Sequence, residues 1–183
     1  MTDYAADVRA FIRDLPQAPV LVGWSMGGLV AMMVAAGGDT AACVGLAPSI
    51  PAASRDAALP LRHGTFGAEE YGIVSRDPGD QPTMSDLDHE ERRTALASLG
   101  LESRLARDER AAGIFVERVP CPLLIVTGGD DRLWPRSRYA EMSLPAEWME
   151  APMASHWGLV LSRRTLVALV PTVTAWIERA VSR

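Results

Sequence analysis

Residues 19–36, PVLVGWSMGGLVAMMVAA, decide the fold of this 183-residue chain. An apolar run of strand length at 19–22 leads into a G-x-S-x-G motif, and the small apolar residues of 26–36 indicate a buried helix. A serine on such a sharp strand-to-helix turn is held in a strained backbone conformation with its hydroxyl exposed. The sequence therefore predicts that Ser25 is a nucleophile and that the Met26 amide, at the positive end of the helix, donates to an oxyanion.

The glycines of this turn support the prediction. We expect side chains at Gly23 and Gly27 to collide as the strand folds back, and Gly28 to let the helix pack closely. The motif by itself is common, and the alternative is an ordinary glycine-rich turn without chemistry. The apolar segments on both sides favour the nucleophile.

Outside this stretch, apolar segments of helix and strand length alternate. The helix expected at 3–15 places Tyr4, Val8, Phe11, Ile12 and Leu15 on one stripe. Further elements are expected as strands at 43–47, 122–127 and 147–150 and as a helix at 165–181. Short buried strands that alternate with helices predict an α/β fold with a parallel sheet of about four strands flanked by helices.

Residues 51–118 interrupt this alternation. They hold thirteen acids and nine arginines, which account for most of the formal net charge of −5. A loop is expected over 51–83, followed by helices at 86–99 and 102–112, with Ser85 and Asp88 in the pattern of an N-terminal cap. We expect a helical cap or lid inserted into a core made of 1–50 and 119–183.

Three histidines compete for the role of the base that a serine nucleophile needs. His156 lies in a loop between the last expected strand and the last expected helix. His89 belongs to a charged helix without a second histidine at i+4, which indicates a solvated face and no metal site. His63 is followed by glycine, as in an oxyanion HG motif, but it comes after the nucleophile where that motif comes before it. The sequence therefore favours His156.

An aspartate follows the strand at 122–127, in the loop GGDDRLWP of 128–135. Loops at the carboxyl ends of parallel strands are where such sheets hold their sites. Asp131 is the candidate that orients the histidine, Asp130 is its neighbouring alternative, and a role in capping the loop is the non-catalytic interpretation of either.

The composition excludes several classes of function. All 18 basic residues are arginines, which excludes a P-loop lysine, a Schiff-base lysine and a Ser–Lys dyad. The net charge of −5 and the lack of a basic run argue against a nucleic-acid partner. Cys43 and Cys121 lie far apart in apolar runs, which indicates reduced thiols in a cytoplasmic protein rather than a disulfide or a zinc site. Neither a signal peptide nor a membrane span is expected.

Three motifs together resemble the α/β-hydrolase superfamily. VLVGWSMGGLVAM at 20–32 resembles its nucleophile elbow, PLLIVTGGDDRLWP at 122–135 its acid strand, and ASHWGLV at 154–160 its histidine loop. The order serine, acid, histidine is also the order of that family. The resemblance implies a serine esterase with Ser25, Asp131 and His156 as its catalytic triad, a small-molecule ester as substrate, and no metal or other cofactor.

The tryptophans next to these motifs are candidates for contact with the substrate. Trp24 precedes the nucleophile, Trp134 follows the acid, and Trp157 follows the histidine. Trp134 and Trp157, together with Met153, are expected either to line an acyl pocket or to pack beneath the loops.

The resemblance also implies a truncated fold. In the family, about half of the sheet precedes the helix at which this sequence starts, and a loop in that part supplies a second oxyanion amide. An unpaired edge is therefore expected on the strand at 20–22, with part of the elbow helix uncovered. Three hypotheses remain: a fragment, a homodimer through the exposed edge, or a short relative with impaired catalysis that acts as a binding or interaction module.

Overall fold

The computed structural model describes residues 1–182 and contains a four-stranded parallel sheet with the strand order β1-β2-β5-β6. The strands are β1 (Val20–Trp24), β2 (Ala42–Leu46), β5 (Leu123–Gly128) and β6 (Glu147–Ala151). Val20 pairs with Ala42, Cys43 with Leu123, and Leu124 with Glu147, so all four strands run in one direction. The expected sheet is confirmed.

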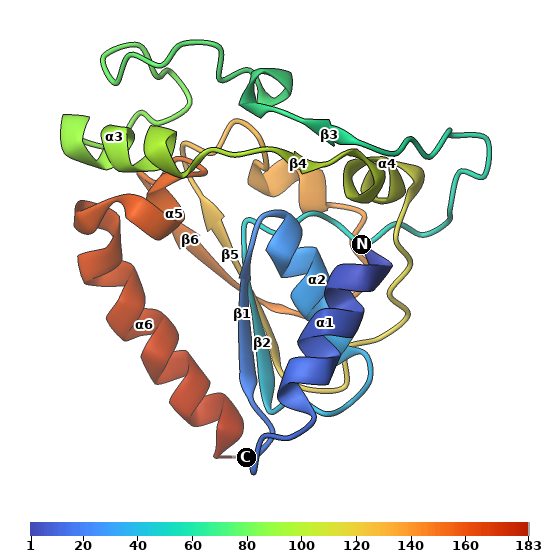
Figure 1. Cartoon of the computed structure of the whole chain (residues 1–183). Coiled ribbons are helices and arrows are strands. Elements are labelled where there is room, and N and C mark those ends of the chain that lie inside the picture. The colour runs from blue at the N-terminus through green and yellow to red at the C-terminus, as the bar shows by residue number, and fades with distance from the viewer. Residues whose placement is uncertain (183) are drawn as a thin grey trace.

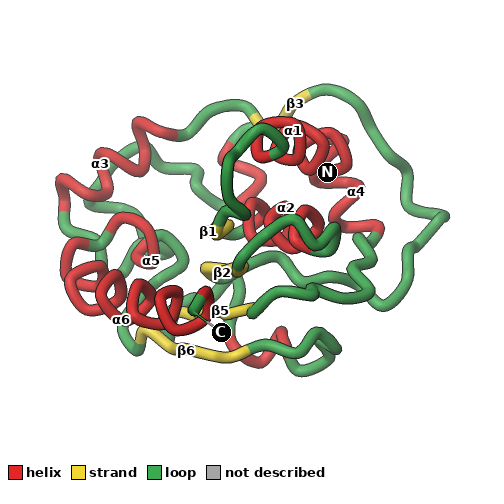
Figure 2. The backbone as a smooth tube through the Cα atoms, turned by 90° about the horizontal axis from the view of Figure 1, so that it is seen from below, coloured by secondary structure: helices red, strands yellow, loops and turns green. Residues whose placement is uncertain are grey.

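Helices cover both faces of this sheet (Figures 1 and 2). One face carries α1 (Thr2–Ile12) and α2 (Met26–Ala35), and the other carries α5 (Gly158–Leu161) and α6 (Arg163–Val181). Two clusters of buried side chains, one on each side of the sheet, form the core. The four strands end at the same edge, and the segments that follow them meet there.

The segment 51–118 lies across this edge of the sheet (Figure 1). It contains β3 (Thr65–Phe66), the 3₁₀ turn η1 (Ala68–Tyr71), α3 (His89–Ser98), β4 (Glu102–Ser103) and α4 (Arg104–Ala112). The antiparallel pair β3–β4 was not expected from the sequence. We call 51–118 the cap segment.

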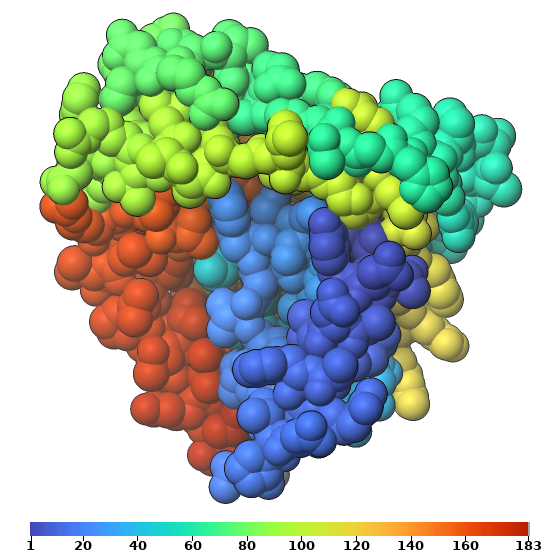
Figure 3. Space-filling model, in the orientation of Figure 1, coloured from blue at the N-terminus to red at the C-terminus, as the bar shows by residue number. Residues whose placement is uncertain are grey.

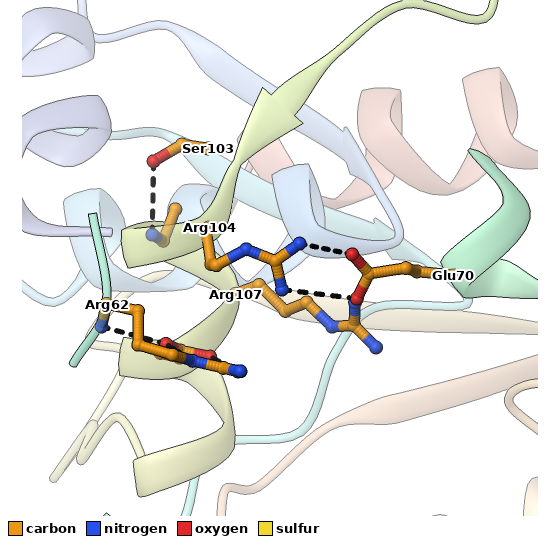
Figure 4. Close-up of polar contacts among 7 residues, drawn as sticks. Arg62, Glu70, Ser103, Arg104 and Arg107 are labelled. Atoms are coloured by element: carbon orange, nitrogen blue, oxygen red, sulfur yellow. Dashed lines mark hydrogen bonds and ion pairs between the residues drawn. The ribbon is translucent and has the colours of Figure 1, made fainter. Parts of the chain in front are cut away.

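Charged side chains hold the first half of the cap segment to α4 (Figure 4). Arg62 donates to both carboxylate oxygens of Asp108, at 2.8 and 2.9 Å, and Arg104 and Arg107 both pair with Glu70. The hydrogen bond from Arg62 and its charge hold the pKa of Asp108 below its usual range. Two acids and three arginines of this segment are therefore paired with one another.

Two helix starts differ from the expected ones because of their caps. Helix α3 begins at His89, since Asp88 and Glu91 form a capping box, whereas Ser85 takes no part in the cap. Helix α4 begins at Arg104, since the Ser103 hydroxyl accepts the amide of Ala106.

Helix α1 differs from expectation in its end and in its buried face. It ends at Ile12 rather than at residue 15, because Pro16 has no N–H to donate to the Ile12 carbonyl, which accepts the Leu15 amide instead. Of the expected stripe, only Ile12 is buried and Val8 half-buried, while Tyr4, Phe11 and Leu15 are exposed. The stripe faces the open side of β1, which pairs with β2 alone, so no strand covers it.

Candidate active site

Ser25 occupies a strained turn between β1 and α2. Its backbone has φ 53° and ψ −122°, in a region that residues other than glycine rarely adopt. Such a conformation costs on the order of 1–3 kcal/mol, and surrounding bonds must maintain it. The Ser25 amide donates to Leu46 at 2.9 Å, and its carbonyl accepts the amides of Gly28 and Ser49. The strained backbone expected at Ser25 is present.

The glycines of the turn have two different environments. A Cβ at Gly23 would collide with the Gly27 backbone, and one at Gly28 would lie 2.5 Å from Pro48 Cβ. A Cβ at Gly27 would meet no atom within 4 Å. The expectation of a collision at Gly27 is therefore wrong, because this residue is exposed and faces an open groove.

The Met26 amide is the first backbone N–H of α2. Within residues 1–182 it donates to no acceptor, and it follows Ser25 directly at the positive end of the helix. The group predicted as an oxyanion donor is thus free to bind an anionic oxygen beside the serine.

Asp131 and His156 form a buried pair. The Nδ1 atom of His156 lies 2.7 Å from Oδ2 of Asp131, while Oδ1 accepts the amides of Leu133 and Trp134 at 2.8 Å each. The exposed fractions of Asp131 and His156 are 3% and 4%, whereas Asp130 is exposed. The structure therefore selects Asp131, not Asp130, as the partner of the histidine.

This contact lowers the pKa of Asp131 and orients the imidazole of His156. Burial by itself would raise the pKa of Asp131, but the hydrogen bond and charge of His156, together with two backbone amides, hold that pKa below its usual value. An ionised carboxylate only accepts hydrogen bonds, so Nδ1 of His156 carries the proton. In the neutral ring, Nε2 is then left with a lone pair, as a general base requires.

Two glycines at the end of β5 bring the acid and histidine loops together. A Cβ at Gly128 or Gly129 would collide with the backbone of Ala154 or Pro152. The amide of Asp130 donates to Ala154 at 3.0 Å, so the two loops also share a hydrogen bond. Consecutive glycines at the end of a strand also signal close backbone approach, and this signal could have predicted the contact between the two loops.

Trp24 joins the serine turn to the histidine loop. Its indole Nε1 donates to the carbonyl of His156 at 3.0 Å, and its ring lies 5.0 Å from the imidazole and 4.9 Å from the Trp157 ring, centroid to centroid. Within the described residues, the Ser25 hydroxyl makes no hydrogen bond to His156. The structure thus brings Asp131 and His156 together as a bonded pair and places Ser25 next to Trp24, which contacts His156.

A groove of about 390 Å³ lies beside the serine, on the face between α1 and α6 (Figure 3). The residues on both sides of Ser25 line it, as do apolar side chains of α1, β1 and α2. The lining includes Tyr4, Val8, Val22, Trp24, Met26 and Val30. Trp24 is the one predicted tryptophan that borders this groove.

The other predicted tryptophans pack elsewhere. Trp134 lies beside Tyr139 and beneath the guanidinium groups of Arg110 and Arg138, and Trp157 packs on Trp24 and on the cap segment. This agrees with the expected alternative that they pack beneath the loops.

The remaining candidates lie apart from this site. His63 and His89 are both exposed, and His89 is the first residue of α3. Across residues 1–182, no three acidic, histidine or cysteine side chains come close enough together to hold a metal ion. Within the same residues, no helix is both long and apolar enough to cross a membrane.

The sequence model of the Alpha/beta hydrolase family matches residues 1–169. This chain belongs to the α/β-hydrolase family. No protein of curated function matches it in sequence. The family assignment accounts for the sheet, the serine turn after β1 and the loops after β5 and β6.

Solved hydrolase structures share this fold at low sequence identity. Polyneuridine aldehyde esterase is 15% identical with a TM-score of 0.63, over 94% of this chain and 78% of its own. Tomato methylketone synthase I, solved with 2-tridecanone, is 17% identical with a TM-score of 0.68, over 98% and 79%. The monoacylglycerol lipase of Paleococcus ferrophilus is 19% identical with a TM-score of 0.58, over 97% and 74%. These likenesses establish the α/β-hydrolase fold.

Proposed function

We propose that this α/β hydrolase cleaves a carboxylic ester through Ser25, His156 and Asp131. The observation that carries the proposal is the buried 2.7 Å contact between Asp131 and His156, held through Trp24 next to a serine in strained conformation. A nucleophile, a base and a group that orients the base are the three parts of this type of catalysis.

The proposed reaction has two steps. In the first, Nε2 of His156 takes the Ser25 proton as Oγ bonds to the acyl carbon, and the Met26 amide donates to the oxyanion that forms. The C–O bond to the alcohol then breaks, and His156 returns its proton to the leaving oxygen. In the second, His156 takes a proton from water, the resulting hydroxide attacks the acyl group, and the acid leaves Ser25 with its proton restored.

The groove supports an apolar acyl group in the substrate. It is lined mainly by aliphatic and aromatic side chains, and it reaches both neighbours of Ser25. Among the structures of the same fold are an esterase and a lipase, which act on esters. We therefore propose a small-molecule ester with an apolar acyl chain, and Trp24 as the aromatic residue that borders it.

A second proposal concerns the open edge of the sheet. Strand β1 pairs on one side alone, carries no charged residue, and exposes 56% of Val22. Natural sheets protect such edges with charges or by covering them. We propose that a second copy of the chain covers this edge in a homodimer. It would close the part of the groove next to Val22 and leave the part beside Trp24 and Met26 for the acyl chain. A non-catalytic binding module remains the alternative function, and it would use the same edge.

The compartment proposed for the protein is the cytoplasm. Cys43 and Cys121 are both free thiols, which a reducing compartment preserves. Burial, together with the neighbouring Cys121, raises the pKa of Cys43 to about 12, so this thiol is unreactive.

Hydrolysis of p-nitrophenyl acetate, butyrate and octanoate tests the proposed reaction. We expect turnover that Ser25→Ala abolishes and that Asp131→Asn lowers by roughly 10³- to 10⁴-fold, because the histidine loses the partner that fixes its tautomer. Asp130→Asn, which alters the adjacent exposed carboxylate, is the matched control and should retain full activity. Turnover that persists in Ser25→Ala contradicts the proposed nucleophile, and a lack of turnover in the wild type favours the binding module.

A further inference from the structure

A side chain of the cap segment bonds directly to the histidine loop. Oδ1 of Asp86 accepts the backbone amide of Ser155 at 3.1 Å, and Oδ2 accepts the Thr165 hydroxyl at 3.2 Å. The Asp86 carbonyl also accepts the hydroxyl of Ser162, the N-cap residue of α6. One residue thus bonds to the residue before His156 and to the start of the helix that follows the loop.

The carboxylate fits against the loop without space to spare. A Cβ at Gly158 would collide with the Asp86 carboxylate, so a residue larger than glycine at 158 would displace it. Ser155 is 1% exposed, and its hydroxyl accepts the Gly158 amide at 3.1 Å. The Asp86 carboxylate is therefore packed against residues on both sides of His156, namely Ser155 and Gly158.

The cap segment makes two further contacts, one with the start of α6 and one with the histidine loop and α5. Oε1 of Glu91 accepts the backbone amide of Arg163 at 2.8 Å. Trp157 and Leu161 pack against a buried apolar cluster that lies wholly in the cap segment. The cluster consists of Ala68, Ile73, Met84, Leu87, Ala95 and Leu96. The cap segment is thus in contact with the loop through Trp157, which also packs on Trp24.

We propose that Asp86 is a positioning residue, which fixes the loop so that His156 faces Asp131. His156 itself bonds to Asp131 and through its carbonyl to Trp24, while Asp86 holds its neighbour Ser155 from the cap segment. The catalytic consequence rests on the proposed esterase function, whereas the effect on the His156–Asp131 contact does not. A shift of the imidazole by about 1 Å is enough to lower a rate by about 100-fold.

The test compares Asp86→Ala with Asp86→Asn in the full chain. Asparagine can still accept from Ser155 with its oxygen and donate to Thr165 with its nitrogen, so it preserves both bonds, and alanine preserves neither. We expect Asp86→Ala to lower kcat by about 10- to 100-fold with little change in KM, and Asp86→Asn to stay near the wild type. Asp80→Ala removes an exposed carboxylate of the same segment and serves as the control for charge.

A second readout follows the histidine directly. The proton shared by Nδ1 of His156 and Asp131 gives a downfield NMR signal, assigned by its loss in Asp131→Asn. We expect this signal in the wild type, Asp80→Ala and Asp86→Asn, and a shifted or missing signal in Asp86→Ala. Ser103→Ala, which removes the cap of α4, controls for general loss of stability, and it should lower the melting temperature without moving the signal.

The variant Gly158→Ala keeps the proposal testable if Asp86→Ala fails to fold, and a double-mutant cycle extends the test where both single variants fold. Gly158→Ala should displace the carboxylate and shift the NMR signal as Asp86→Ala does. The double variant Asp86→Ala/Gly158→Ala should lower kcat and shift the signal no more than either single variant, because the alanine methyl group no longer collides with a carboxylate. Effects that simply add would overturn the proposal, as would an unchanged signal and kcat in Asp86→Ala or a wild type without the signal. A signal that responds as expected in a protein without esterase activity supports the positioning role and contradicts the proposed function.

Discussion

The indole Nε1 of Trp24 donates to the main-chain carbonyl of His156 at 3.0 Å, across 132 positions of the sequence. Trp24 is the last residue of β1 and the residue before Ser25. His156 lies in the loop after β6, and β1 and β6 are the two outer strands of the sheet. One hydrogen bond thus links the serine turn to the loop that carries the histidine. The relative position of the two groups depends on this tryptophan.

Substitutions at Trp24 separate its hydrogen bond from its packing. Trp24→Phe removes the donor and retains a ring, and we expect it to lower the free energy of unfolding by about 0.5–1.5 kcal/mol. Trp24→Ala also removes the contacts with His156 and Trp157, and we expect a loss of about 3 kcal/mol together with a strong loss of hydrolysis. Urea denaturation and ester turnover check both variants, and equal losses in the two would contradict the separate role of the hydrogen bond.

The free energy of unfolding at acidic pH tests the lowered pKa of Asp131. Its pKa in the folded protein lies below the value in the unfolded chain, so its contribution to stability is fully present above about pH 4 and is lost as the pH falls further. We expect the difference in unfolding free energy between the wild type and Asp131→Asn to shrink as the pH is lowered from 5 to 3. Asp130→Asn should follow the wild type over this range, and a difference that stays constant for Asp131→Asn would contradict the lowered pKa.

Thr127 is a site where a substitution should increase stability. Its side chain is buried, with 1% exposed, and within residues 1–182 its hydroxyl finds no hydrogen-bond partner. An unsatisfied buried hydroxyl costs about 1–3 kcal/mol, and valine has nearly the same shape. We expect Thr127→Val to raise the free energy of unfolding by about 1 kcal/mol. Thr40→Val is the matched control, since the Thr40 hydroxyl has a partner in Cys121 at 3.3 Å and no gain is expected there.

The proposed homodimer predicts a response to charge on the open edge. Val22→Arg places a cation at the centre of β1, where it would prevent another strand from pairing. Light scattering after size-exclusion chromatography should give a dimer mass for the wild type and a monomer mass for Val22→Arg. Phe11→Ser on α1 lowers apolar exposure outside the strand, and this variant should remain dimeric. A monomeric wild type would contradict the proposal.

Much of the fold could be predicted because its signals are local. Strand length, the serine turn and the order of the motifs depend on residues close together in sequence, and the structure has all four expected strands within two residues of their expected bounds. The G-x-S-x-G motif likewise predicts the strained conformation of Ser25, because a reversal from strand to helix needs it.

The features that sequence reasoning missed depend on contacts between distant segments. Periodicity shows that α1 has an apolar stripe but not which element covers it, and Phe11 is 75% exposed. The open space at Gly27 exists because no strand pairs with the outer side of β1. The contact of Asp86 with Ser155 joins residues 69 positions apart. The sequence predicted Asp131 and kept Asp130 as its alternative, and the contact with His156 distinguishes the two.

Reaction with a fluorophosphonate probe tests the central claim most directly, because only an activated serine attacks it at a useful rate. Intact-mass spectrometry of the wild type, Ser25→Ala and a control serine variant, Ser98→Ala, measures the number of adducts. We predict one adduct on the wild type and on Ser98→Ala and none on Ser25→Ala. No adduct on folded wild-type protein, or an adduct that persists in Ser25→Ala, would contradict the claim that Ser25 is an activated nucleophile.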